Sequence, residues 1–155
     1  MRTDLATLVR ELAVAGASGI EIETNGRMLG YPGYVRSLRD AGVTRLMIKL
    51  FGRDEASWDE HTRLPGSFTQ TLRGIEIVRR VAPRIDLVAL AVPRRTAGAG
   101  LQDLVALARE LAFQRVRVEL RLAKLDLANL PHLAEEVRAL RAGPPTGIQV
   151  DVSTI

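Results

Sequence analysis

Charged side chains alternate with apolar ones along several short segments of this sequence. Glu21 and Glu23 alternate with isoleucines, Lys49 occupies the same kind of position in a later segment, and Glu119 and Arg121 do so again. If these segments are strands of one sheet, the charged side chains share a face, because successive side chains of a strand point to opposite sides. Such a face could bind a small zwitterionic or phosphate-bearing ligand. Alternatively, the same groups neutralise one another in a layer of ion pairs that is partly open to water.

Composition excludes several other kinds of site. The chain has no cysteine, so it can form no disulfide, use no thiolate nucleophile and bind no zinc or iron–sulfur cluster through its own thiolates. Its two histidines, His61 and His132, lie in different segments. Residues 54–61 are rich in acidic groups, but such a run is more typical of a solvated loop than of a cation site. We therefore expect no metal.

Length and charge narrow the class of protein further. The 155 residues are 46% hydrophobic and 26% charged, which is globular composition, and we expect residues 1–155 to form a single domain. The formal net charge is +4, but arginines are interleaved with acidic residues, so we do not expect nucleic-acid binding. No apolar run approaches the roughly 20 residues of a membrane span. The first 16 residues lack the uncharged core of a signal peptide, so we expect a cytoplasmic protein that binds no membrane.

Helices and strands are predicted to alternate along the chain. Helical spacing of apolar residues predicts helices over about 4–15, 33–40, 67–82, 101–112 and 129–140. Period-two alternation or short apolar runs predict strands over 19–24, 43–50, 84–92, 115–122 and 147–152. Residues 51–66 are polar and irregular, which predicts a long loop with room for one helical turn.

This alternation is typical of a parallel sheet with helical connections. Two arrangements fit it: an open sheet with helices on both faces, or part of a barrel with helices outside. In four of the five predicted strands one face is apolar and the other is charged, which a sheet covered on both faces would rarely tolerate. We therefore predict an α/β fold, a partial (β/α) TIM-like barrel with parallel strands, helices on the outer face and a polar concave face.

Several short motifs together resemble part of a known enzyme family. They are Ile-Glu-Thr-Asn-Gly at 22–26, Leu-Arg-Asp-Ala-Gly at 38–42, Ile-Lys-Leu-Phe-Gly at 48–52, and then Asp54, His61, Gly-Ser-Phe at 66–68, Thr71-Leu72 and Gly74-Ile75. Their order is similar to the middle of a radical S-adenosylmethionine enzyme, most closely from about Ile20 to Arg80. The resemblance implies a partial barrel with S-adenosylmethionine in its concave face. It also implies that Glu23, Thr24, Asn25 and Lys49 are the cofactor-binding residues.

The chain departs from that family in the cluster-binding part. The family carries Cys-x-x-x-Cys-x-x-Cys after its first strand and a Gly-Gly-Glu-type stretch after its second, and neither is present here. The resemblance therefore implies no cofactor bound by this chain alone beyond S-adenosylmethionine, and an iron–sulfur cluster only if a missing N-terminal part supplies it. Independent radical catalysis is not expected without a cluster, so we assign no catalytic residue and leave open whether the protein is an enzyme.

Two functions remain open. The chain could be a non-catalytic partner or scaffold, or the C-terminal piece of a split or truncated radical S-adenosylmethionine enzyme. Alternatively, it is a binding protein or enzyme for a small molecule, S-adenosylmethionine included, that uses the polar concave face. In either case the resemblance implies that the strand at residues 20–24 lacks a neighbour. We expect this edge to pair with a second copy or with a partner chain.

Overall fold

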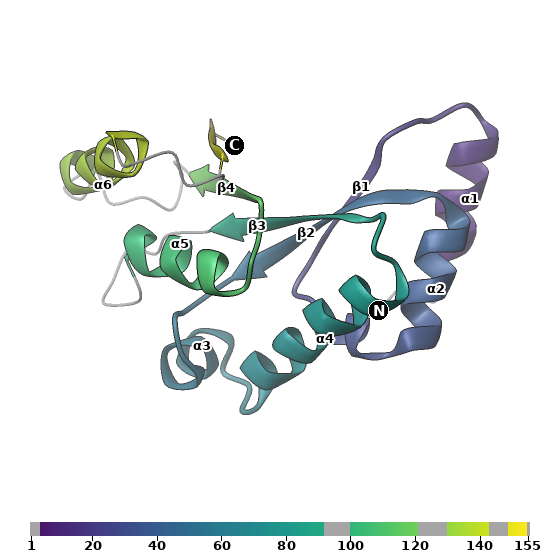
Figure 1. The fold of residues 1–155 in the computed structure, drawn as a ribbon, viewed down its shortest axis with the longest axis horizontal. Helices are drawn as coiled ribbons and strands as arrows, with labels where there is room; N and C mark the ends of the chain where they lie inside the picture. Colours follow the sequence, from purple (N-terminus) through teal and green to yellow (C-terminus); the bar gives the residue numbers. More distant parts are fainter. Residues whose placement is uncertain (1–3, 92–99, 121–129, 143–148, 155) are drawn as a thin grey trace. The chain divides into compact units, whose positions relative to one another are not determined.

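The computed structural model describes residues 4–91, 100–120, 130–142 and 149–154, in which helices and strands alternate (Figure 1). The helices are α1 (Leu5–Val14), the 3-10 helix η1 (Arg27–Gly30), α2 (Pro32–Ala41), α3 (Glu55–Thr62), α4 (Ser67–Val81), α5 (Leu101–Glu110) and α6 (Leu130–Ala142). The strands are β1 (Ile20–Thr24), β2 (Val43–Leu50), β3 (Asp86–Ala91), β4 (Arg115–Leu120) and β5 (Gln149–Thr154). The predicted ends at residues 92, 121–122, 129 and 147–148 lie outside the described residues, as does Arg121.

The strand order in the sheet is β1-β2-β3-β4-β5, which is also the order along the chain. The pairs β1–β2, β3–β4 and β4–β5 are parallel. The predicted α/β fold with parallel strands is confirmed. Among the described residues, no helix combines the length and the apolar character that a bilayer crossing requires.

The chain divides into two compact units, which are described separately, so a single domain stays a prediction. The first unit comprises residues 1–48 and 69–87. Here β1 pairs with β2, with Glu21 opposite Arg45 and Glu23 opposite Met47. One side of this pair is apolar because residues of β2 at alternating positions, such as Leu46 and Ile48, are buried. The fully buried side chains of this core include Val35, Leu38, Leu46, Ile48, Ile75 and Val78.

The second unit comprises residues 49–68 and 88–155. Within its described part, β4 pairs with both β3 and β5, and alternate residues such as Val116 and Val118 are buried. Helix α5 contributes an apolar face of Leu101, Leu104 and Ala108, and all three side chains are buried.

The prediction of a loop over residues 51–66 is wrong, because residues 55–62 form helix α3. A capping box starts this helix. The Asp54 carboxylate accepts a hydrogen bond from the Ser57 backbone N–H at 2.8 Å, and Ser57 Oγ accepts one from the Asp54 N–H at 3.3 Å. Trp58 then anchors the helix, because its side chain is only 1% exposed and its ring packs edge-on against Phe51 and Phe68. Because Trp58 is the buried residue of α3, the helix has no stripe of apolar residues from which the sequence could have predicted it.

Candidate functional site

The polar face predicted for the strands exists in the first unit as a row of ion pairs. The Arg45 guanidinium on β2 donates to the Glu21 carboxylate of β1 and, at 2.7 Å, to Asp86 Oδ2 of β3. The hydrogen bond to Asp86 is the main reason that the pKa of Arg45 is raised. The three side chains are 25–31% exposed. At this level of the sheet the charged groups form ion pairs with one another, which is the alternative that the sequence left open.

The predicted residues Glu23, Thr24 and Asn25 lie together where β1 ends. Glu23 is exposed and points to the same side as Glu21, whereas Thr24 belongs to the half-buried positions that face the helices. Thr24 Oγ1 accepts a hydrogen bond from the Gly26 N–H at 3.1 Å, and Asn25 Oδ1 accepts one from the Arg27 N–H at 3.3 Å. These two side chains shape the turn that leads from β1 into η1.

Helix α4 fixes this turn in place. The hydroxyl of Thr71, which is 1% exposed, donates a hydrogen bond of 2.9 Å to the Asn25 carbonyl oxygen. Gly26 has a φ of 80°, in the left-handed region that favours glycine. At Gly74 the helix approaches the Gly26 carbonyl so closely that a side chain there would overlap it. The strand end is therefore held by a hydrogen bond and by close backbone packing.

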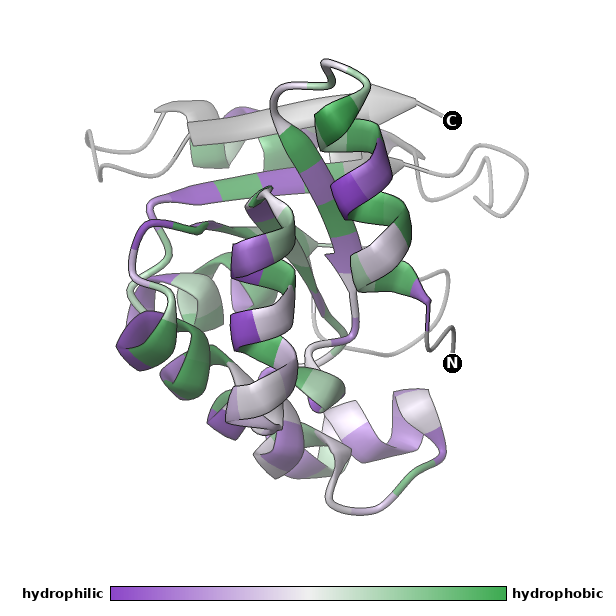
Figure 2. Cartoon of the chain, turned by 90° about the vertical axis from the view of Figure 1, so that its right-hand side faces the viewer, coloured by the Kyte–Doolittle hydropathy of each residue, from purple (hydrophilic) through white to green (hydrophobic). Residues whose placement is uncertain are grey.

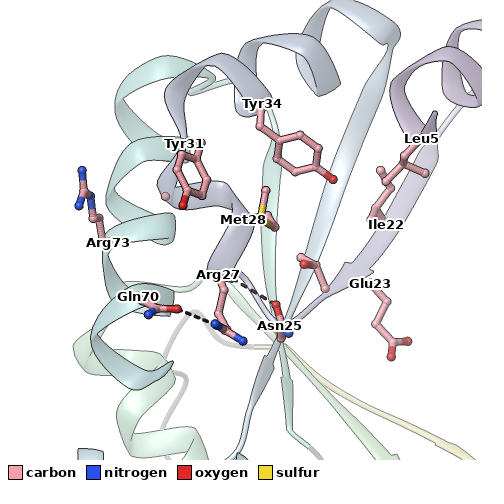
Figure 3. Close-up of a pocket in the computed structure, with 12 residues that line it drawn as sticks. Leu5, Ile22, Glu23, Asn25, Arg27, Met28, Tyr31, Tyr34, Gln70 and Arg73 are labelled. Atoms are coloured by element: carbon pink, nitrogen blue, oxygen red, sulfur yellow. Dashed lines mark hydrogen bonds between the residues drawn. The ribbon is translucent and has the colours of Figure 1, made fainter. Parts of the chain in front are cut away.

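A pocket of about 710 Å³ adjoins the turn (Figure 3). Glu23, Thr24 and Asn25 belong to its lining, as do residues from α1, η1, α2 and α4. The members that the sequence analysis did not identify are Leu5, Ile22, Arg27, Met28, Gly30, Tyr31, Tyr34, Gln70 and Arg73. Most of them lie within 22–34, close to Asn25 along the chain, but Leu5, Gln70 and Arg73 come from distant segments that no spacing could have grouped with them.

The pocket combines charged, aromatic and apolar groups. Arg27 Nε donates to Gln70 Oε1 at 2.7 Å, which holds its guanidinium at the rim. Tyr31 is 63% exposed, whereas burial raises the pKa of the Tyr34 phenol. Figure 3 shows the Tyr34 ring and Met28 in the middle of the pocket, with Glu23 at its border. Such a mixture suits a small ligand with both apolar and polar parts.

The fourth predicted site residue, Lys49, belongs to the second unit. It is half-buried near the end of β2. Of the other charged positions predicted for the polar face of this unit, Arg117 is also half-buried, and Glu119 is placed by its backbone pairing with Ser153. The structure thus gathers three of the four predicted site residues in one place, and it describes the fourth separately.

The acidic run at residues 54–61 has structural roles. Asp54 caps α3, and the Asp59 carboxylate accepts hydrogen bonds from the Gly66 N–H at 2.6 Å and the Ser67 hydroxyl at 3.0 Å, at the start of α4. The His61 ring lies against Phe51 at an interplanar angle of 35°, with ring centres 4.5 Å apart. Within the described ranges, no three histidine or acidic side chains are grouped so that they could hold a metal ion.

Comparison with known proteins gives relatives for part of the chain. It is 37% identical over 79 residues to an AdoMet-dependent heme synthase of Methanosarcina barkeri, which is 51% of this chain and 22% of that protein. It is 36% identical over 96 residues to a GTP 3',8-cyclase of Bradyrhizobium diazoefficiens, which is 58% of this chain and 27% of the cyclase. The chain thus spans about a quarter of the length of these relatives. No family model matches it.

Solved structures match nearly the whole chain. Streptococcus suis SuiB superposes with a TM-score of 0.66 at 16% identity, over 99% of this chain and 36% of SuiB. SuiB bound to S-adenosylmethionine gives a TM-score of 0.64 at 17% identity. At this identity the likeness shows the fold, and a partial TIM-like barrel agrees with it. Together the sequence relatives and the shared fold show that this chain is related to the radical S-adenosylmethionine enzymes.

Proposed function

We propose that this chain forms one wall of a radical S-adenosylmethionine site whose cluster ligands lie outside these 155 residues. The observation that carries the proposal is the strand end at Glu23–Asn25. Hydrogen bonds hold the turn that follows it in place, and the chain is related to that family. By this proposal the protein is a partner, or one piece, of a complete enzyme.

The donor groups of the chain decide which cofactors it can hold. An iron–sulfur cluster in this family is bound by thiolates, and the sequence contains none, so the residues present do not fit a cluster. S-adenosylmethionine carries hydroxyl, ammonium and carboxylate groups. The exposed Glu23 carboxylate at the end of β1 suits the hydroxyl or ammonium groups of such a ligand.

The chain's own residues would bind and orient the cofactor. When bound, S-adenosylmethionine supplies a carbon–sulfur bond that is cleaved reductively. Glu23 would accept hydrogen bonds from the ligand, and the Thr24–Gly26 turn would set the position of Glu23 because α4 fixes it. Lys49 belongs to the second unit and stays a prediction from the resemblance.

A chimera tests this role. In the AdoMet-dependent heme synthase of Methanosarcina barkeri, the segment that matches this chain is replaced by the corresponding residues of this chain. We expect the chimera to retain reductive cleavage of S-adenosylmethionine above the level of a cluster-free control. Adding Glu23→Ala should lower it at least tenfold, whereas Glu60→Ala, at an exposed position of α3, should leave it unchanged. A folded, cluster-loaded chimera without any cleavage would refute the proposal.

A second candidate is a free-standing protein that binds a small molecule. It is favoured by the pocket of about 710 Å³ beside Glu23 and Asn25, a volume typical of ligand sites. Titration calorimetry of the isolated chain with S-adenosylmethionine separates the two. Micromolar binding would favour this candidate, whereas the proposed partial wall should give no measurable heat by itself.

A further inference from the structure

The pocket beside the strand end lies on the helical side of β1, and all of its lining belongs to the first unit. Ile22 and Thr24 face this side, whereas Glu23 stands at the border. Figure 2 shows the alternation of apolar and polar residues along β1, with α1 next to the strand. The pocket is therefore separate from the row of ion pairs, and its own lining decides what it can bind.

Two arginines of this lining, Arg27 and Arg73, have no acidic partner in the part of the chain that the structure describes. Arg39 and Arg45 of the same unit, by contrast, each bind a carboxylate. The lining thus holds two positive charges against the single negative charge of Glu23. An excess of positive charge around a pocket favours an anionic ligand.

Gln70 orients one of the two guanidinium groups. Its side-chain oxygen accepts the Arg27 Nε–H at 2.7 Å, and no other described side chain bonds this guanidinium. The terminal nitrogens Nη1 and Nη2 of Arg27 are therefore available to a ligand. They present two parallel N–H donors, which match the two oxygens of a carboxylate. Arg73 follows on the next turn of α4 and adds a second positive charge at an exposed position.

The rest of the pocket suits a flat aromatic body. Figure 3 shows the Tyr34 ring and Met28 between the two arginines on one side and Leu5 and Ile22 on the other. An aromatic ligand packs favourably against another ring and against a thioether sulfur. The volume of about 710 Å³ is within the range of sites for ligands larger than a single ring.

We infer that this pocket binds an anionic aromatic small molecule, with its carboxylate on Arg27 and its rings against Tyr34 and Met28. The inference goes beyond the proposed wall, and it names by charge the ligand of the pocket on which the second candidate function rests. S-adenosylmethionine is not that ligand, because its sulfonium and ammonium groups outweigh its one carboxylate and make it a cation. The inferred site therefore stands or falls without S-adenosylmethionine.

Three small molecules test the inference with the full chain. The probe is 2-naphthylacetate, which joins two aromatic rings to a carboxylate. The first control is 2-naphthylacetamide, which has the same rings without the charge, and the second is octanoate, which has the charge without the rings. We expect the probe to bind at least tenfold more tightly than either control, because it alone meets both requirements.

Methionine methyl groups report where the probe binds. They are labelled with carbon-13 and followed by NMR during each titration, without S-adenosylmethionine, so the result is separate from that of the chimera. The ring current of 2-naphthylacetate should shift the Met28 signal. The Met47 signal is the internal reference and should stay in place, because Met47 of β2 lies outside the pocket lining.

A matched pair of variants tests the role of the guanidinium. Arg27→Gln should weaken 2-naphthylacetate at least fivefold and leave the affinity for 2-naphthylacetamide unchanged, because only the acid needs the positive charge. Arg36→Gln is the control and should change neither affinity, since Arg36 is an exposed arginine of α2 in the same unit but outside the lining. Thermal unfolding by circular dichroism verifies that each variant is folded.

Three results would overturn the inference. The first is equal affinity for the acid and the amide, which would mean that charge is not recognised. The second is octanoate binding as tightly as 2-naphthylacetate, which would mean that rings are not recognised. The third is an unchanged Met28 signal at millimolar 2-naphthylacetate, which would mean that the pocket does not take this class of ligand.

Discussion

The close approach of α4 to the turn after β1 leads to a sharp prediction for Gly74→Ala. A methyl group at Gly74 would overlap the carbonyl oxygen of Gly26 and lie 3.1 Å from Leu29 Cβ. The oxygen belongs to a backbone turn whose neighbouring carbonyl, at Asn25, is held by the Thr71 hydroxyl. The turn therefore cannot swing aside as a side chain would, and either the helix or the turn must move.

The magnitude follows from two opposing effects. Alanine is favoured over glycine in a helix interior by about 1 kcal/mol. Overpacking a well-filled site costs about 1–3 kcal/mol, and a rigid backbone neighbour puts Gly74 at the upper end of this range. We expect the free energy of unfolding of Gly74→Ala to fall by about 2 kcal/mol, although alanine is the better helix former.

Gly33→Ala is the matched control. Gly33 lies in α2, and a Cβ there would meet no atom within 4 Å. It should gain stability, by up to about 1 kcal/mol. Urea unfolding followed by circular dichroism measures both variants, and a loss of about 2 kcal/mol lowers the midpoint by roughly 1 M urea. If Gly74→Ala has the same midpoint as the parent chain or a higher one, the reasoning about the turn fails.

Three further predictions concern other described contacts. Trp58→Ala should lower the free energy of unfolding by about 3–5 kcal/mol, and Trp58→Phe by clearly less, in the same urea assay. Burial alone would raise the pKa of Asp59, but hydrogen bonds at the start of α4 lower it overall, so its stabilisation is present at neutral pH and is lost as the pH falls through the folded-state pKa. Asp59→Asn should therefore destabilise the chain at pH 7 and flatten the acid limb of its stability curve, measured by thermal unfolding from pH 2 to 7. Arg45→Met leaves two neighbouring carboxylates without their shared guanidinium, so it should cost about 1 kcal/mol at low salt and less in about 1 M salt, which screens the ion pairs, and equal losses at both would contradict the ion-pair row.

Local patterns in the sequence predicted most of the fold. The alternation of isoleucine and glutamate over residues 20–23 predicted both the strand and its two faces, because strand geometry has a fixed period of two. Glycine at position 42 marked the end of a helix correctly, and its φ of 108° explains why. Signals of this kind depend on a few neighbouring residues, so they can be recognised without knowing how the rest of the chain folds.

Features that depend on distant residues were not predictable in the same way. Helix α3 has a single buried anchor, Trp58, so its apolar pattern was too weak, although Asp54 and Ser57 carried a capping signal. Asn25 and Glu23 were singled out through the resemblance to the radical S-adenosylmethionine enzymes, but the pocket beside them depends on α2 and α4. The steric role of Gly74 could only be found once the helix was placed on the turn.

The match between strand order and chain order bears on how the protein is made. Each strand pairs with the one that precedes it along the chain, so every new pairing closes only the crossover between two consecutive strands. Short loops of this kind keep contact order low for a parallel sheet and favour fast folding. During synthesis, β1 and β2 can form a parallel pair under α2 before β4 leaves the ribosome, and each later strand then adds to an edge already in place.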